Sequence, residues 1–188
     1  MNKLQQHRLF NGNQQIWQHD AHSFQIYLPP MCEQGYRVPT IYCLANREFD
    51  FAQTGIQRYA AQWGIALVFI NHSELLADLL KTLPEILPLN EQISLLSHGQ
   101  HSDFALRFAA ENPVSAWTAF NPEISDEAVK LYTENAQRTA MLIDQSVPTE
   151  LGNLPAKVNL RKSYDNSIHF LSTFADVHIE FHADGFGL

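Results

Sequence analysis

The stretch Ile93-Ser94-Leu95-Leu96-Ser97-His98-Gly99-Gln100-His101 is an apolar run that enters a tight turn, and it decides the fold class. The segment that follows it, 102–113, has the pattern of a helix that ends at the pair Asn112-Pro113. A strand, a sharp turn and a helix in this order have the layout of the nucleophile-elbow motif G-x-S-x-G. Gly99 stands where that motif has its serine, so the sequence predicts an elbow without a nucleophile.

Strand-like and helix-like segments alternate on both sides of this stretch, which favours βαβ units around a largely parallel sheet. The predicted strands are 24–28, 38–44, 65–70, 93–96, 114–119, 141–143 and 158–160. The predicted helices are 51–63, 75–86, 102–113, 128–136 and 168–181. We therefore expect an α/β fold with helices on both faces of the sheet.

The two first strands differ in pattern. Segment 24–28 alternates in polarity and stops at Pro29-Pro30, which predicts an antiparallel strand at the N-terminal edge of the sheet. Segment 38–44 is a nearly continuous apolar run, which is typical of a strand buried on both faces. Gly64 is expected to end the helix 51–63. The closing helix carries one apolar stripe, made of Ile168, Leu171, Phe174, Ala175 and His178.

Composition excludes several classes of function. The chain has 188 residues, of which 45% are hydrophobic, and no repeat or linker divides it, so we expect a single domain over 1–188. A formal charge of −8 argues against nucleic acid as a partner, because phosphate binding needs clustered Lys and Arg. Neither a signal peptide nor a run of roughly 20 apolar residues is present, which predicts a cytoplasmic protein that does not bind membranes. Cys32 and Cys43 are expected to be reduced.

Seven pieces of the chain, in order, resemble the S-formylglutathione hydrolases of the esterase D type, which are α/β-hydrolases. The pieces are 17–20, 26–30, 41–44, the elbow region, 115–122, 142–145 and 164–174. Together they span nearly the whole chain. The resemblance implies a three-layer α/β-hydrolase-like fold with a mostly parallel sheet.

Carried over residue by residue, the resemblance implies that the catalytic triad is lost. The family's nucleophilic serine falls on Gly99, its catalytic acid falls on or near Thr149, and its histidine falls on Asn166. Asparagine cannot take up a proton near neutral pH, so Asn166 cannot act as the general base. The family's glycine-rich oxyanion loop is represented by the shorter segment 45–49, and three connections that carry substrate-binding loops are shortened. These positions are therefore vestigial.

Polar residues gather at the predicted carboxyl end of the central strand, the place where α/β sheets bind ligands. The candidate pocket residues are His98, Gln100, His101, Ser102, Asn46, Glu150 and His169. The alternative is that those near the elbow only cap a helix and face water. His101 replaces a glycine of the family and should widen the elbow or push the helix outward. His169 could substitute for the missing base, but a partly buried helix position is the favoured interpretation.

His178 and His182 are four residues apart in the last helix, a spacing that can hold a metal ion. No third ligand accompanies them in the sequence. A surface helix face is therefore the favoured interpretation, and we expect neither a metal nor another cofactor.

The leading hypothesis is a non-catalytic relative of the S-formylglutathione hydrolases with a binding, interaction or regulatory role, towards a small molecule or a protein. The competing hypothesis is an altered carboxyl-ester or thioester hydrolase that uses His98, His101 or His169 with Ser102 or Ser97. A decaying remnant that still folds fits the sequence as well as the first. Self-association is expected because the shortened chain should expose apolar surface. The aromatic residues that motivate it are Trp17, Phe51, Trp63 and Trp117.

Overall fold

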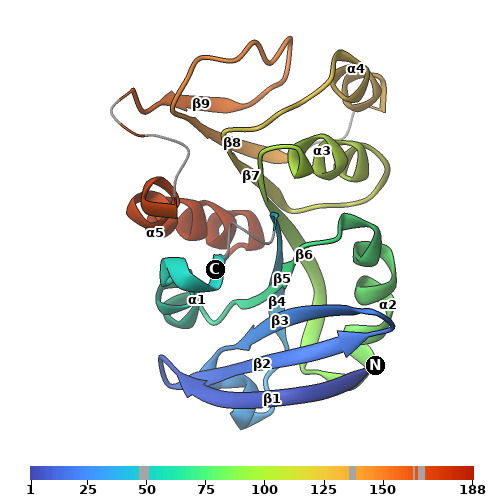
Figure 1. Ribbon diagram of the computed structural model, residues 1–188, viewed down its shortest axis with the longest axis vertical. Helices are drawn as coiled ribbons and strands as arrows, with labels where there is room; N and C mark the ends of the chain where they lie inside the picture. Colours follow the sequence, from blue (N-terminus) through green and yellow to red (C-terminus); the bar gives the residue numbers. More distant parts are fainter. Residues whose placement is uncertain (47–50, 136–138, 163, 165–167) are drawn as a thin grey trace.

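The computed structural model describes residues 1–46, 51–135, 139–162, 164 and 168–188 (Figure 1). In this part of the chain, nine strands form one sheet in the order β1-β2-β3-β5-β4-β6-β7-β8-β9. The strands are β1 (Asn2–Leu9), β2 (Gly12–His19), β3 (His22–Leu28), β4 (Val38–Leu44), β5 (Ala66–Ile70), β6 (Leu89–His98), β7 (Ala116–Phe120), β8 (Ala140–Gln145) and β9 (Lys157–Leu160). The α-helices are α1 (Ile56–Trp63), α2 (Leu76–Ile86), α3 (His101–Glu111), α4 (Asp126–Asn135) and α5 (Ile168–Phe186).

The sheet has a parallel part and an antiparallel part. Neighbouring strands from β5 through β4 to β9 pair in parallel. Strands β1, β2 and β3 form an antiparallel meander, which joins the rest through the antiparallel pair β3–β5. This arrangement confirms the expected mostly parallel sheet with antiparallel strands at its N-terminal side.

The edge position predicted for 24–28 is wrong, because β3 lies inside the sheet between β2 and β5. The sequence pattern missed the two strands outside it. Strand β1 has the sequence NKLQQHRL and is exposed along nearly its whole length, so it shows no apolar period. Polar strands of this kind are stabilised by backbone hydrogen bonds to a neighbouring strand, and these bonds produce no hydrophobic pattern in the sequence.

Helices cover both faces of the sheet and form the outer layers of a three-layer fold (Figure 1). Helices α1 and α5 pack on one face, where Ile56, Ala60, Phe170 and Ile179 join one hydrophobic core cluster. Helices α2, α3 and α4 pack on the other face against a second cluster. The central strand β4 is buried along its whole length, because it is covered on both faces.

Several predicted elements have different bounds in the structure. Strand β6 begins at Leu89 rather than at residue 93, and the extra half carries the polar side chains of residues 90–92. The helix predicted over 51–63 is interrupted at Gly55, whose φ of 73° separates a 3-10 turn (Phe51–Thr54) from α1. Gly64 ends α1 in the left-handed conformation, as predicted.

The exposure of the aromatic residues and the character of the helices bear on two predictions, self-association and the lack of a membrane span. Trp17 and Trp117 are buried, whereas the side chain of Trp63 is 38% exposed, and that of Phe51 lies outside the described side chains. Of the four aromatic residues that motivate the prediction of self-association, Trp63 is therefore the one that the structure shows to be exposed. Within the ranges given above, no helix is both long enough and apolar enough to cross a membrane.

Candidate functional site at the elbow

The elbow is formed by the end of β6, Gly99 and the start of α3. Gly99 has a φ of 57°, in the left-handed region that glycine adopts without strain. Its backbone N–H donates to the carbonyl of Phe120 at 3.3 Å, and its carbonyl accepts from the backbone N–H groups of Ser102 at 3.1 Å and Glu123 at 3.0 Å. The turn predicted between strand and helix is therefore present and is held on both sides.

The carboxylate of Glu123 faces Gly99. Among the described residues, the Oε1 atom of Glu123 is the side-chain atom that a Cβ added at Gly99 would meet within 4 Å, at 3.7 Å. That separation is an ordinary van der Waals contact. The described residues therefore leave room for a side chain at this position.

The two serines beside the elbow are fully buried. Their Oγ atoms lie 3.0 Å apart, and the indole Nε1–H of Trp117 donates to Ser97 Oγ at 2.9 Å. These bonds join β6, α3 and β7 inside the core. Because Ser97 and Ser102 are closed off from solvent, a substrate in solution cannot reach either hydroxyl.

His101 is the first residue of α3 and is only 7% exposed. Its Nε2 atom lies 2.9 Å from Asn46 Oδ1, which also accepts from Gln100 Nε2 at 3.0 Å. An amide oxygen only accepts hydrogen bonds, so Nε2 of His101 carries the hydrogen. Burial lowers the pKa of His101, His98 and His72 lower it further, and Glu74 opposes them in part. The ring is therefore neutral at pH 7.

The structure brings some of the expected pocket residues together and separates others. Asn46, Gln100 and His101 share one hydrogen-bonded cluster, with the buried His98 at the end of the adjoining strand. Exposed Glu150 does not line the pocket described below.

His169 was expected in a partly buried position on the closing helix. Its side chain is exposed on α5, so this prediction is wrong. The first turn of α5 faces outward at this residue, and its ring lies 5.9 Å from that of Tyr164. Asn166 lies outside the described residues, as do positions 47–49 of the expected oxyanion loop.

A pocket of about 430 Å³ opens next to the elbow. It is formed by the segments that follow β7 and β8 and is lined by Asn121, Pro122, Glu123, Ile124, Ser146, Val147 and Thr149. Thr149, the position expected from the resemblance to correspond to the catalytic acid, is the predicted site residue that lines it. The carboxyl ends of parallel strands are where ligands bind in α/β sheets. Sequence reasoning missed the other lining residues, although the Asn-Pro pair directly after a buried strand marks this edge.

Asn121 joins the two sides of the pocket. Its φ of 42° is in the left-handed region, which is uncommon for a residue with a side chain. The Oδ1 atom of Asn121 accepts from the backbone N–H of Ser146 at 2.6 Å and from its hydroxyl at 3.0 Å. The segment after β8 is thereby joined to the segment after β7 by hydrogen bonds within the protein.

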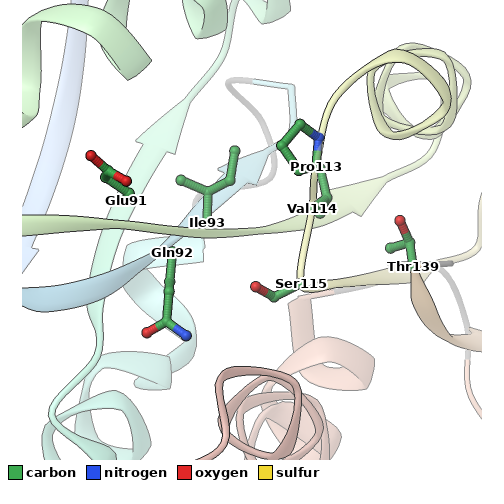
Figure 2. Close-up of a pocket in the computed structure, with 7 residues that line it drawn as sticks. All are labelled: Glu91, Gln92, Ile93, Pro113, Val114, Ser115 and Thr139. Atoms are coloured by element: carbon green, nitrogen blue, oxygen red, sulfur yellow. The ribbon is translucent and has the colours of Figure 1, made fainter. Parts of the chain in front are cut away.

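A second pocket of about 390 Å³ lies at the opposite ends of the strands, where β7 and β8 begin (Figure 2). It is lined by Glu91, Gln92, Ile93, Pro113, Val114, Ser115 and Thr139. Figure 2 shows Gln92 and Ile93 on opposite sides of β6, and the Nε2 atom of Gln92 donates to the carbonyl of Phe186 at 3.2 Å. Because this pocket lies at the amino ends of β7 and β8, it is away from the elbow, and we do not include it in the candidate site.

Asp144 lies at the carboxyl end of β8 and is fully buried. Its Oδ1 atom accepts from Asn159 Nδ2 at 2.7 Å, and its Oδ2 atom contacts Arg161 Nε at 3.4 Å and His178 Nε2 at 3.5 Å. Burial by itself raises the pKa of Asp144, but the contacts with His178, Asn159 and Arg161 outweigh it, and the pKa lies below its usual value. An ionised carboxylate therefore joins β8, β9 and α5.

The surface position favoured for His178 and His182 is wrong, because both side chains are fully buried. This side of α5 packs on β7 and β8, which supply polar partners: Thr118 Oγ1 lies 2.9 Å from His182 Nε2, and Asp144 contacts His178. The ring of His178 also stacks on Phe120 at 3.9 Å. Burial lowers the pKa of both histidines. In the ranges that the structure covers, no group of three or more His, Cys, Asp and Glu could hold a metal ion.

Comparison with known proteins supports the fold assignment. No protein-family model matches the chain. An S-formylglutathione hydrolase from Agrobacterium tumefaciens superposes with a TM-score of 0.77 and 18% identity, over 98% of this chain and 99% of that chain. FphF, a fluorophosphonate-binding serine hydrolase from Staphylococcus aureus, gives 0.70 and 12% over 89% and 96% of the two chains. Est1E from Butyrivibrio proteoclasticus gives 0.59 and 12% over 93% and 99%. The protein therefore has the α/β-hydrolase fold, which it shares with these structures.

Proposed function

We propose that the protein is a non-catalytic relative of the S-formylglutathione hydrolases and esterases, and that it binds a small ligand in the pocket beside the elbow. One observation carries the proposal. The tip of the elbow is Gly99, with a φ of 57°, and a pocket opens beside it. The scaffold thus presents a binding site at the usual edge of the sheet without a nucleophile.

The size and the construction of the pocket support a binding role. Its volume of about 430 Å³ falls within the range of about 300 to 1,000 Å³ that is typical of small-molecule sites. Apolar side chains of Pro122 and Ile124 lie beside polar ones, and the Asn121–Ser146 bonds hold the two sides together. A pocket whose two sides are held by internal hydrogen bonds requires little reorganisation on binding, which favours affinity.

The competing proposal is an altered ester or thioester hydrolase. His101 supports it, because this buried neutral imidazole lies at the elbow with a fixed tautomer. The burial of Ser97 and Ser102 opposes it, because nucleophilic catalysis requires an accessible hydroxyl within reach of a base. The same buried hydroxyls already bond to each other and to Trp117.

A fragment screen by ligand-observed NMR tests the binding role. The screen compares the protein with a Thr149→Trp variant, in which an indole would fill part of the pocket, and with a Thr173→Trp variant on α5. Both threonines are exposed, so the second variant controls for the added side chain. We expect fragments that bind the unmodified protein and Thr173→Trp but not Thr149→Trp. If Thr149→Trp leaves every fragment bound, the proposed site is wrong.

A further inference from the structure

We propose that the ligand of this pocket is a small organic cation, an alkyl ammonium or guanidinium group with a short apolar body. This inference rests on the proposed binding function and adds the chemical class of the ligand. It follows from three observations: a carboxylate in the pocket that forms no ion pair with a described residue, hydroxyl groups that donate within the protein, and the position of that carboxylate in front of Gly99.

Glu123 supplies the charge. It is the charged residue among the seven that line the pocket. In the parts of the chain that the structure covers, no Lys, Arg or His forms an ion pair with it. The nearby cation Arg107 is already bound to Asp103 at 2.8 Å and to Glu127 at 2.9 Å. The Glu123 carboxylate is therefore free to pair with a cation from outside.

The hydroxyl groups of the pocket present oxygen lone pairs. The Ser146 hydroxyl donates its hydrogen to Asn121 Oδ1 at 3.0 Å, and the Thr149 hydroxyl donates to the carbonyl of Val147 at 3.5 Å. A hydroxyl that has used its hydrogen can still accept. A ligand group that only donates, such as an ammonium or a guanidinium, matches these oxygens and the carboxylate together. A carboxylate or phosphate ligand would meet acceptors and a negative charge.

The elbow leaves room for such a group in front of the carboxylate. The Oε1 atom of Glu123 lies 3.7 Å from the place where a side chain at position 99 would begin. Apart from the two chain neighbours of Gly99, no other described residue comes within 4 Å of that place. His101 is neutral at pH 7 because burial lowers its pKa, so it adds no positive charge that would repel a cation. Val147, which is 68% exposed, and Ile124 offer apolar contact to an alkyl chain.

A matched series of ligands tests the charge. Pentylamine, which is protonated at pH 7, is compared with 1-pentanol and with pentanoate, because the three share one alkyl chain. Binding is followed by amide chemical shifts of the labelled protein, which also report the position of the ligand. We expect pentylamine to bind most tightly and to shift the amide signals of Gly99 and Glu123.

Two variants identify the residue responsible. Glu123→Gln keeps the shape of the side chain and removes its charge, whereas Glu111→Gln changes the net charge equally at an exposed site on α3. We expect Glu123→Gln to raise the Kd of pentylamine roughly twofold to fivefold, as for an exposed ion pair, and Glu111→Gln to leave it unchanged. Thermal unfolding of both variants shows whether each is folded.

The outcomes separate this inference from the proposed function. If 1-pentanol binds as tightly as pentylamine, or if Glu123→Gln has no effect, the inference about charge is overturned and the pocket still binds ligands. Tightest binding of pentanoate overturns it in the same way. If none of the three shifts the signals of the pocket, the inference is overturned, and the fragment screen then decides whether the binding function fails as well.

Discussion

Replacing Gly99 by alanine tests whether the elbow keeps the backbone conformation that we describe. Among the described residues, the added methyl group meets one side-chain atom, Glu123 Oε1 at 3.7 Å, and this distance is not a clash. The cost comes from the φ of 57°, since a residue with a side chain in the left-handed conformation loses roughly 1 to 2 kcal/mol. We therefore expect the free energy of unfolding to fall by about 1 to 2 kcal/mol, which lowers Tm by roughly 2 to 8 °C for a chain of this size.

Urea denaturation and calorimetry measure this change. Gly35→Ala is a suitable control, because Gly35 has a φ of 86° and nothing within 4 Å of an added Cβ, and it lies far from the elbow. We expect Gly35→Ala to cost at least as much. If Gly99→Ala leaves stability unchanged, the backbone of the elbow is not left-handed. If it costs more than about 4 kcal/mol, which backbone strain alone cannot explain, the space before Glu123 is not open.

Four further predictions follow from the buried polar contacts and the elbow. Asp144→Asn should lower the free energy of unfolding by about 3 kcal/mol in urea titration, because it breaks a buried charged contact. The folded-state pKa of Asp144 is depressed, so its stabilising contribution is present above the unfolded pKa of about 3.9 and is lost as the pH falls through the folded value. In Asp144→Asn, the free energy of unfolding should therefore fall less steeply at acid pH than in the unmodified protein. The pKa of His182 is lowered by burial, so stability should decline as the pH falls below the unfolded value of about 6.5, and His182→Gln should reduce that slope. Ser97→Ala should lower the free energy of unfolding by about 1 to 3 kcal/mol in urea titration, because it leaves the buried Trp117 N–H unpaired. Gly99→Ser should give a folded protein without esterase activity.

The parallel core of the sheet could be predicted from sequence because burial on both faces imposes a simple pattern. The runs 38–44 and 65–70 are apolar at almost every position, and they form β4 and β5 side by side. The elbow was predictable for the same reason, since an apolar strand stops at a glycine and a helix follows. Strand β1 was not predictable, because its residues face water and its partner β2 is visible in the fold alone.

The candidate site was less predictable than the fold. Sequence reasoning named candidate pocket residues at the elbow and at Asn46, Glu150 and His169. The pocket beside the elbow is lined by two other segments, after β7 and after β8, that are distant from each other in sequence. Glu123 and Ser146 belong to no motif, and their proximity follows from the order of strands. His178 and His182 were misplaced because histidine is polar, although their helix face is apolar. Thr118 lies within hydrogen-bond distance of His182 and Asp144 contacts His178, and no local sequence pattern reveals either partner.

The proposed loss of the nucleophile at the elbow has a physical explanation. A serine in this conformation is strained, and strain of this kind persists where function requires it. Glycine at position 99 removes the strain and leaves the hydrogen bonds of the turn in place. The scaffold, the pocket and the elbow can thus be stable without the chemistry that the elbow serves in serine hydrolases.

The most direct test of the non-catalytic proposal is hydrolysis by the purified protein. p-Nitrophenyl acetate and S-formylglutathione serve as substrates, and a fluorophosphonate probe reports any activated serine. We predict no turnover above the buffer rate and no labelling by the probe, in the unmodified protein and in Ser102→Ala and His101→Ala alike. Turnover above the buffer rate that disappears in Ser102→Ala or His101→Ala, while both variants remain folded, would contradict the account.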